Sequence, residues 1–441
     1  MGLKYIEHVK SVVLILLILF SFTLTFSIWT YSPVIPTSEG TTVDISIAEK
    51  KKMKDIIKPY RMIVSQDDGL KGSFASQPIE FVLDNMKNWE IQTVELASNK
   101  VDSNQINEFI KYPNRLSLFF TADVPVDVLG NILNLSDENF SEAHFNRLII
   151  DWNENTPDSM IIYFISTSQQ KMYTATAEKV NKAGFTNRIL KHTETMQVYN
   201  EIITDDKLSV YVSSTPESIL SYTYSIKDVN TEKFKDALFN NPNLVRSNPV
   251  SMNEQQFTDD SALMKVNFST RRLNYVHPAS ENENPAKSVD LIQNSLNFVN
   301  EHNGWTDDYR YSRMNTDDRQ INYQLYFAGL PVFSREITEI SLKWGVDRVH
   351  QYIRPLYTLT AAVPLKTREV QLASGQSIYD FLSTATDINM STIDDVVVAY
   401  YLTRDETESQ FILEPSWYYL ESGAWIRISP ELLGGAKYGL E

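Results

Sequence analysis

Hydrophobic and polar positions divide the chain into one long apolar stretch and a remainder of short periodic patterns. Residues 12–31 contain fifteen apolar residues in twenty, and no charged residue interrupts them. A helix of this length spans ~30 Å, which is the thickness of the hydrocarbon core of a bilayer. No second run of comparable length occurs. The pattern therefore predicts a single transmembrane helix over residues 12–31.

A cleaved signal peptide is the main alternative for this segment. The apolar core of a signal peptide usually has about 7–15 residues and is followed by small residues at the cleavage site. Here the run is longer and ends in Ile28, Trp29 and Tyr31, with Pro33 after them. Trp and Tyr are typical of the membrane–water interface. We therefore favour an uncleaved anchor.

The flanking charges predict the orientation of this helix. Lys4 and Lys10 precede it, and no Lys or Arg occurs from residue 11 to residue 49. The positive-inside rule then places residues 1–11 in the cytoplasm as a short tail and residues 32–441 outside the cell. Such a tail is too short to fold into an output domain. An inward signal would have to pass through contacts of the membrane helix or through a partner.

Four hydroxyl side chains in the helix are candidate contacts for a partner helix. Ser21 and Thr25 lie one turn apart, as do Thr23 and Ser27, and Trp29 follows as a fifth candidate. Small residues at this spacing allow close helix approach, and hydroxyl hydrogen bonds between helices contribute about 0.6–2 kcal/mol. The alternative is that the hydroxyls bond back to carbonyl groups of their own helix. The sequence leaves both interpretations open.

The rest of the chain divides into a linker and three regions. Residues 32–57 begin rich in Pro, Ser and Thr, which is typical of a linker. Changes in the pattern suggest an N-terminal domain at 58–205, a middle domain at 206–345 and a C-terminal domain at 346–441. Helical spacing occurs at 77–87, 104–112 and 376–383, and residues 178–202 also read as mainly helical.

Strand-like runs alternate with these single helices. Examples are residues 116–121, 160–166, 172–177, 322–327 and 396–402, which are rich in β-branched and aromatic residues. Hairpins separated by single helices favour an α+β fold with mainly antiparallel sheets and packed helices over a parallel doubly wound fold.

Composition narrows the functional classes. The chain has 40 Lys and Arg against 56 Asp and Glu, a net charge of −16. Residues 1–31 carry +1, so the remainder carries −17, which disfavours nucleic acid as a partner. The absence of cysteine excludes disulfides, thiolate metal sites and a Cys nucleophile.

Motifs of catalysis and cofactor binding are not found. None of the six histidines forms an H-E-x-x-H motif, and the sequence contains no G-x-S-x-G, G-x-G-x-x-G or P-loop pattern. Adjacent aspartates occur six times, and four of these pairs follow Thr. Calcium binding is one interpretation, but none has EF-hand spacing, and Asp is common in turns and helix caps. We expect no enzyme activity, no cofactor and no metal.

Several segments together resemble the YycH family. The resemblance covers essentially the whole chain and depends on segments in the expected order rather than on one motif. These segments are residues 8–33, FNRLIID at 145–151, LVRS at 244–247, GLPVF at 329–333 with 340–344, and EPSW at 414–417 with GAW at 423–425.

The resemblance implies a regulator of the sensor histidine kinase WalK (YycG), which controls cell-wall metabolism in Gram-positive bacteria. Members have one N-terminal membrane helix, here residues 12–29, and a three-domain extracellular part. They act together with YycI, and the complex contacts WalK largely through transmembrane helices. The family has no catalytic residues, and regulation is inhibitory in some members and activating in others. Homo- and hetero-dimers are both compatible with this role.

Two other functions fit the same sequence. One is an extracellular binding module that captures a cell-wall fragment or an ion independently of a kinase, which a deep pocket with a few converging polar groups would favour. The other is an anchored wall hydrolase, which a cleft with two carboxylates of perturbed pKa would favour.

Overall fold

The computed structural model describes most of the chain after residue 49 and part of the apolar segment. The described residues are 14, 16–23, 25, 50–92, 94–130, 132–135, 143–153, 156, 158–203, 207–281, 284–359, 364–386, 388–405, 407 and 409–429. The chain divides into two units, Met1–Thr41 and Thr42–Glu441.

The described residues of the first unit are helical. Across the described part of the chain, no helix has both the length and the apolar character that crossing a bilayer requires. The predicted transmembrane segment lies only partly in this range, because residues 12, 13, 15, 24 and 26–31 are outside it. The membrane anchor therefore stays a prediction.

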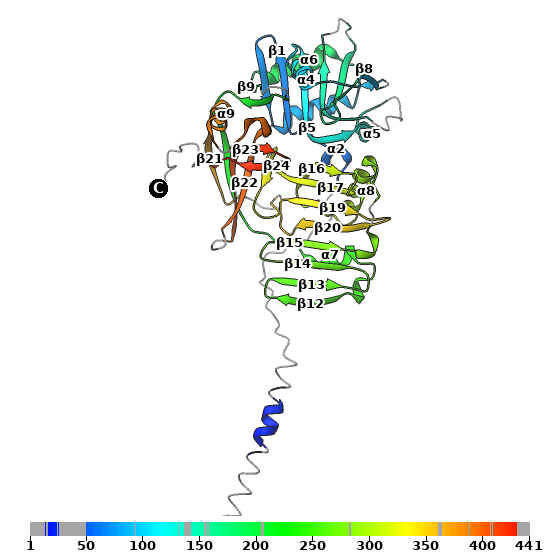
Figure 1. Cartoon of the computed structure of the whole chain (residues 1–441), viewed down its shortest axis with the longest axis vertical. Helices are drawn as coiled ribbons and strands as arrows, with labels where there is room; N and C mark the ends of the chain where they lie inside the picture. Colours follow the sequence, from blue (N-terminus) through cyan, green and yellow to red (C-terminus); the bar gives the residue numbers. More distant parts are fainter. Residues whose placement is uncertain are drawn as a thin grey trace, which may run out of the picture. The chain divides into compact units, whose positions relative to one another are not determined.

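The second unit begins with a sheet of ten strands. Its strands are β1 (Arg61–Gln66), β2 (Gly69–Ser73), β3 (Glu90–Ile91), β4 (Glu95–Ser98), β5 (Arg115–Pro125), β6 (His144–Asp151), β7 (Met160–Ser166), β8 (Lys171–Glu178), β9 (Gln197–Ile202) and β10 (Val210–Ser213). Their order is β10-β9-β2-β1-β5-β6-β7-β8-β3, and β4 also pairs with β8 (Figure 1).

Helices cover both faces of this first sheet. The helices of this part are α2 (Met53–Ile56), α3 (Ser76–Met86), α4 (Ser103–Lys111), α5 (Val126–Leu129) and α6 (Lys182–Thr193). Alternate residues of β5 belong to different hydrophobic clusters: Leu118 lies with residues of α3 and α6, and Phe119 lies with residues of α4. Because helices cover both faces, the first six residues of β5 are all buried, including the polar residues Arg115 and Ser117.

The prediction that residues 178–202 are mainly helical is wrong at its C-terminal end. The helix α6 ends at Thr193, and residues 197–202 form β9, which pairs with β2 and β10. Pairing in this position buries Tyr199 and Ile202. Burial in a sheet has therefore outweighed the local helical pattern.

The remaining strands form a second sheet of fourteen strands. They are β11 (Glu217–Ser225), β12 (Arg246–Ser251), β13 (Glu254–Thr258), β14 (Leu263–Asn267), β15 (Arg272–Val276), β16 (Asp308–Asn315), β17 (Gln320–Phe327), β18 (Leu330–Phe333), β19 (Glu339–Trp344), β20 (Val349–Pro355), β21 (Lys366–Leu372), β22 (Ile393–Asp405), β23 (Gln410–Glu421) and β24 (Ala424–Arg427). The order is β12-β13-β14-β15-β20-β19-β17-β18-β22-β23-β11-β21, with β16 beside β17 and β24 beside β23.

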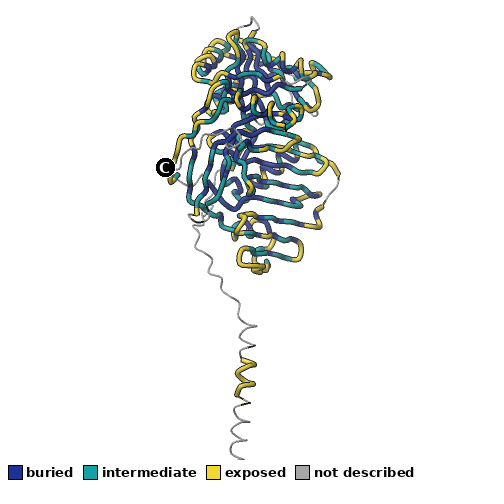
Figure 2. The backbone as a smooth tube through the Cα atoms, turned by 60° about the vertical axis from the view of Figure 1, so that its left-hand side comes forward, coloured by how far each residue is buried: buried dark blue, intermediate teal, exposed yellow. Residues whose placement is uncertain are grey.

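Within the described residues, three α-helices and three short 3₁₀ helices accompany this sheet. They are α7 (Thr231–Leu238), α8 (Ser288–Glu301), α9 (Gly375–Thr384), η1 (Pro242–Leu244), η2 (Pro278–Ser280) and η3 (Met390–Thr392). Figure 2 shows that burial is concentrated in the central strands, whereas β12 at one edge is exposed at all six positions.

The short strand β18 connects the two halves of the second sheet. It forms a hairpin with β17, and Gly329 in the turn has φ +85°. A side chain at Gly329 would be strained there and would lie 2.9 Å from the carbonyl oxygen of Phe74. On its other side β18 pairs with β22, which is the one parallel pairing among the described strands.

The predicted α+β class with mainly antiparallel sheets is confirmed, while the three domain boundaries stay predictions.

Arg354 of β20 is fully buried and binds the loop that follows α8. Arg354 donates to the carbonyl oxygen of Gly304 at 2.6 Å and to Thr306 Oγ1 at 3.0 Å. The Nε2 atom of His302 lies 3.1 Å from the hydroxyl oxygen of Tyr352, beside this guanidinium. Burial, and then the charge of Arg354, lower the pKa of His302 to about 3. The imidazole of His302 is therefore neutral in the folded protein at pH 7.

Acidification should destabilise the fold through His302. An unfolded histidine titrates near about 6.5, so between that pH and about 3 the unfolded state binds a proton that the folded state does not. We expect His302→Gln to reduce the stability lost between pH 7 and pH 4 by about 2–3 kcal/mol. Urea unfolding at both pH values would measure it. Equal losses in the variant and the native protein would contradict the prediction.

Candidate functional site

The structure describes three of the five predicted partner-facing residues. Thr23 Oγ1 donates to the carbonyl oxygen of Phe20 at 2.8 Å, and Thr25 Oγ1 donates to that of Ser21 at 2.8 Å. These bonds match the second interpretation of the hydroxyl spacing. Each oxygen can still accept a hydrogen bond, so a role in partner contacts stays a prediction. Ser27 and Trp29 lie outside the described residues.

Large apolar side chains of the same helix are uncovered. Leu14, Phe20 and Phe22 are 59%, 63% and 71% exposed. The other described Leu and Ile side chains in the segment are also exposed. These apolar side chains are therefore left uncovered by the rest of the described chain.

Lys51 follows the predicted anchor and precedes the first strand of the first sheet in the sequence. Its contacts are with residues beside the second sheet. The backbone N–H of Lys51 donates to Asn300 Oδ1, and Asn300 Nδ2 donates to the carbonyl oxygen of Lys51, both at 2.9 Å. Lys51 Nζ donates to the carbonyl oxygen of Asp307 at 2.7 Å and lies 3.8 Å from the Asp308 carboxylate. Burial lowers the pKa of Lys51, although these acids oppose the shift. Residues 50–51 are thus attached to α8 and β16.

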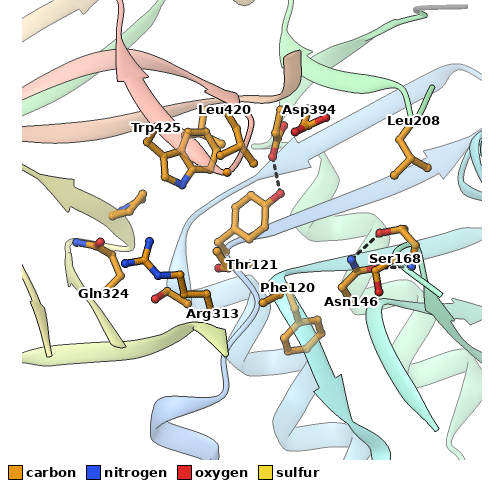
Figure 3. Close-up of a pocket in the computed structure, with 18 of the residues that line it drawn as sticks. Phe120, Thr121, Asn146, Ser168, Leu208, Arg313, Gln324, Asp394, Leu420 and Trp425 are labelled. Carbon is orange, nitrogen blue, oxygen red and sulfur yellow. Dashed lines mark hydrogen bonds between the residues drawn. The ribbon is translucent and has the colours of Figure 1, made fainter. Parts of the chain in front are cut away.

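A cavity of about 640 Å³ opens between the two sheets. From the first sheet it is lined by residues of β5, β6 and the β7–β8 turn; from the second, by residues of β16–β19 and β22–β24. Figure 3 shows Phe120, Thr121 and Asn146 on the first side and Arg313, Gln324 and Trp425 on the second.

Three irregularities in strand pairing lie at this cavity. Register shifts occur after Phe119 in β5, after Tyr311 in β16 and after Ile393 in β22. Bulges of this kind redirect side chains and are over-represented next to functional sites. The residues that they displace include cavity-lining Thr121, Ser312 and Asp394.

The carboxylates in the cavity wall are all paired with cations. Glu339 Oε2 lies 2.8 Å from Arg313 Nη2, and Asp394 Oδ1 lies 3.5 Å from Lys207 Nζ. The third, Asp395, binds Arg61 from behind the wall at 3.1 Å. Little uncompensated negative charge therefore faces the cavity.

Arg147 differs from the other cations of this wall. Its Nη1 donates to the carbonyl oxygens of Asn146 at 2.9 Å and Phe120 at 3.5 Å, and its guanidinium carbon lies 4.4 Å from the ring centre of Phe119. No carboxylate among the described residues lies within 4 Å of its nitrogens. The guanidinium is therefore held in place while its charge is not neutralised by an acid.

Arg61 joins the two sheets beneath the cavity. It is 5% exposed, and it donates to Asp395 Oδ1 at 3.1 Å and to the carbonyl oxygen of Val396 at 2.8 Å. The Tyr60 hydroxyl donates to the other oxygen of Asp395 at 2.5 Å. Burial, and then the Asp395 charge, raise the pKa of Tyr60 above its usual range. Burial lowers the pKa of Arg61, but the interactions with Asp395, Tyr60 and Tyr199 together outweigh burial, so the net shift of this pKa is upward.

The paired aspartates occupy different environments. Asp259 accepts from the backbone N–H groups of Ser261 and Ala262 at 2.8 Å, which is turn chemistry. Asp308 and Asp395 are in ion pairs, and Asp205 and Asp206 lie outside the described residues. Among the residues with described positions, no group of three or more His, Asp or Glu is placed to hold a metal ion.

Reasoning from sequence did not identify the cavity or the Arg61–Asp395 pair. Arg61 and Asp395 are 334 positions apart in the sequence, and neither belongs to a motif. The one feature of the sequence that pointed to Asp395 is its place in one of the six Asp-Asp pairs. The interpretation of these pairs as turn residues predicted no cation as a partner for Asp395.

Comparisons with known proteins were made on the whole chain. Residues 7–198 match the family model "YycH protein, N-terminal domain", and residues 207–433 match "YycH protein, C-terminal domain". The chain is 24% identical over 458 residues to the "Two-component system WalR/WalK regulatory protein YycH" of Bacillus subtilis (strain 168), with 99% of each chain covered. The crystal structure of YycH from Bacillus subtilis superposes with a TM-score of 0.74 at 21% identity, covering 88% of this chain and 100% of that one.

Removing one member of the buried pair should be costly. In Asp395→Ala, Arg61 is left charged and buried without its partner, so we expect a loss of about 3–5 kcal/mol in the free energy of unfolding. Denaturant unfolding followed by tryptophan fluorescence would measure this loss.

The neighbouring Asp394 provides a matched control. It is about half exposed in its pair with Lys207, so Asp394→Ala should cost only about 0–1 kcal/mol. The double variant Arg61→Met/Asp395→Leu should recover part of the loss of the single variant, because no charge remains buried alone. If Asp394→Ala and Asp395→Ala were equally destabilising, the buried pair would not be the important contact.

Proposed function

Because the chain belongs to the YycH family, we propose that it is a non-enzymatic regulator of the WalR/WalK two-component system. Its target in this proposal is the sensor histidine kinase WalK (YycG), and it acts together with YycI. The observation that carries the proposal is the match of two consecutive family models to residues 7–198 and 207–433. The coverage of the Bacillus subtilis relative over 99% of its length supports it.

The proposed topology is that of a single-pass protein of the cell membrane. The N-terminus lies in the cytoplasm, the helix over residues 12–31 crosses the bilayer and residues 32–441 are extracellular. The uncharged apolar run and the positions of Lys4 and Lys10 support this arrangement. The exposed apolar side chains of the described helical residues support it as well.

Contacts of the membrane helix are the proposed route to the kinase. A cytoplasmic tail of about ten residues cannot carry a folded effector. On the extracellular side, Lys51 is bound at its backbone by Asn300 and at its ammonium group by Asp307. Lys51, which follows the predicted anchor and linker in sequence, is therefore attached to α8 and to the start of β16.

A second candidate function is capture of an extracellular ligand independently of a kinase. The specific observation that favours it is the cavity between the two sheets. Its wall has irregular strand pairing and contains Arg147, which has no carboxylate of the described residues within 4 Å. The two functions are compatible, since a ligand-binding part can also regulate.

Exchange of the membrane helix tests the regulatory proposal. Replacing residues 12–29 with an unrelated apolar helix of equal length should disconnect the protein from WalK while the extracellular part stays folded. Co-purification of the kinase from membranes and a WalR-dependent reporter would measure the effect. A reporter response and a co-purified amount equal to those of the native protein would overturn the proposal.

A finer variant retains the helix and removes its hydroxyls. Substitution of Ser21, Thr23, Thr25 and Ser27 by Ala should weaken association with the partner helix by about 3- to 30-fold for each interhelical bond that is lost. The matched control is Thr30→Ala, which removes a hydroxyl outside the two small-residue pairs.

A further inference from the structure

We propose that the cavity between the two sheets binds a short peptide that ends in a carboxylate, with the carboxylate on Arg147 and an apolar side chain against Trp425 and Phe333. This proposal goes beyond the regulatory function, because it requires no kinase. Its basis is the size of the cavity, the state of Arg147, the charge balance of the wall and an aromatic surface within it.

The size of the cavity suits a small ligand. Ligand sites usually have volumes of about 300–1,000 Å³ and combine apolar walls with a few placed polar groups. The cavity has about 640 Å³. Three separate bulges contribute to its wall, so irregular backbone from both sheets converges on one place.

Arg147 is arranged as an anion anchor. Both of its hydrogen bonds to carbonyl oxygens come from Nη1, and the plane of the guanidinium is supported by the ring of Phe119. The edge formed by Nε and Nη2 is one of the two edges of a guanidinium that can make bidentate bonds to a carboxylate, and the described residues place no carboxylate there. A fixed, partly buried guanidinium binds a carboxylate with little further loss of conformational freedom.

The charge balance favours a single negative charge on the ligand. Each wall carboxylate already has its own cation: Arg313 for Glu339, Lys207 for Asp394 and Arg61 for Asp395. Among the described residues that line the cavity, Arg147 is the cation left over. One planar carboxylate neutralises it, whereas a phosphate dianion would need a second unpaired cation.

An aromatic surface in the same cavity suits an apolar side chain. The rings of Phe333 and Trp425 are stacked, with centroids 5.7 Å apart and planes at 28°. Hydrogen-bonding groups for a peptide backbone are also present, since Asn146, which directly precedes Arg147, and Thr167 of the β7–β8 turn line the cavity. Asn146 Nδ2 donates to Thr167 Oγ1 at 2.6 Å, which holds both side chains in place.

Binding of a matched pair of probes tests the proposal. The full-length protein in lipid nanodiscs would be titrated by calorimetry with N-acetyl-Ala-Phe and with the same dipeptide as its C-terminal amide, each up to 10 mM, with empty nanodiscs as the blank. We expect saturable binding of the acid, and at least tenfold weaker binding of the amide, because the amide cannot form a charged pair with Arg147. Equal binding of both, or no saturable binding of the acid, would overturn the proposal.

Variants assign the effect to its residues. Arg147→Gln should abolish the preference for the acid, and Arg147→Lys should keep a reduced preference because the charge remains but the fork is lost. The double variant Arg313→Gln/Glu339→Gln is the matched control, since it removes one cation and its paired carboxylate from the same cavity without changing the net charge, and its preference should stay native. Trp425→Ala should weaken acid and amide to the same extent. An undiminished preference in Arg147→Gln would overturn the assignment.

Titration with N-acetylmuramic acid distinguishes a peptide carboxylate from a sugar carboxylate as the ligand group. This compound carries its carboxylate on a sugar and not at a peptide end. Weaker binding than that of N-acetyl-Ala-Phe supports the peptide assignment. Binding of the sugar acid that depends on Arg147, together with no binding of the dipeptide, would overturn it in favour of a sugar ligand. A denaturant midpoint close to the native value in each variant would show that a loss of binding is not a loss of folding.

Discussion

The buried ion pair between Arg61 and Asp395 is the contact on which the arrangement of the two sheets depends. Both side chains are largely removed from water, so each charge carries a desolvation cost of several kcal/mol. The direct pair, the Tyr60 hydroxyl and the carbonyl oxygen of Val396 together offset this cost. Since Arg61 begins β1 and Asp395 lies at the bulge of β22, the pair connects the first sheet to the second. The walls of the cavity are held by the same contact.

One strand connects the cavity with the segment that leads from the predicted membrane anchor. Ser312 and Arg313 of β16 line the cavity, while Asp308 at the start of the same strand lies 3.8 Å from Lys51. Arg310 forms an ion pair with Asp308 between these two places. Although burial opposes it, the Arg310 charge holds the pKa of Asp308 below its usual range, so the carboxylate stays charged. The contacts of β16 therefore run from the cavity wall to Lys51.

Local sequence patterns predicted the helices and strands better than they predicted which strands pair with one another. The helical spacing at 77–87 and 104–112 matches α3 and α4, because each buries one apolar face and α4 has an Asp102–Gln105 capping box. The pattern failed at residues 197–202, where pairing with β2 and β10 decided the conformation. The buried parallel pairing of β18 with β22 was also beyond prediction, because it joins segments almost seventy positions apart.

The sequence by itself determined the apolar segment at 12–31, the α+β class and the family resemblance, because each depends on composition or on periodicity within a short window. The tertiary structure alone decided which charges are paired. Glu339, Asp394 and Asp395 look alike in the sequence, yet their partners come from β16, from the chain before β10 and from β1. Arg147 likewise looks like any other strand arginine in the sequence. Only the folded structure shows that no carboxylate of the described residues lies within 4 Å of its guanidinium nitrogens. Coulomb interactions act over a few ångströms of space whatever the separation along the chain, so only the folded chain shows which charge is left unbalanced.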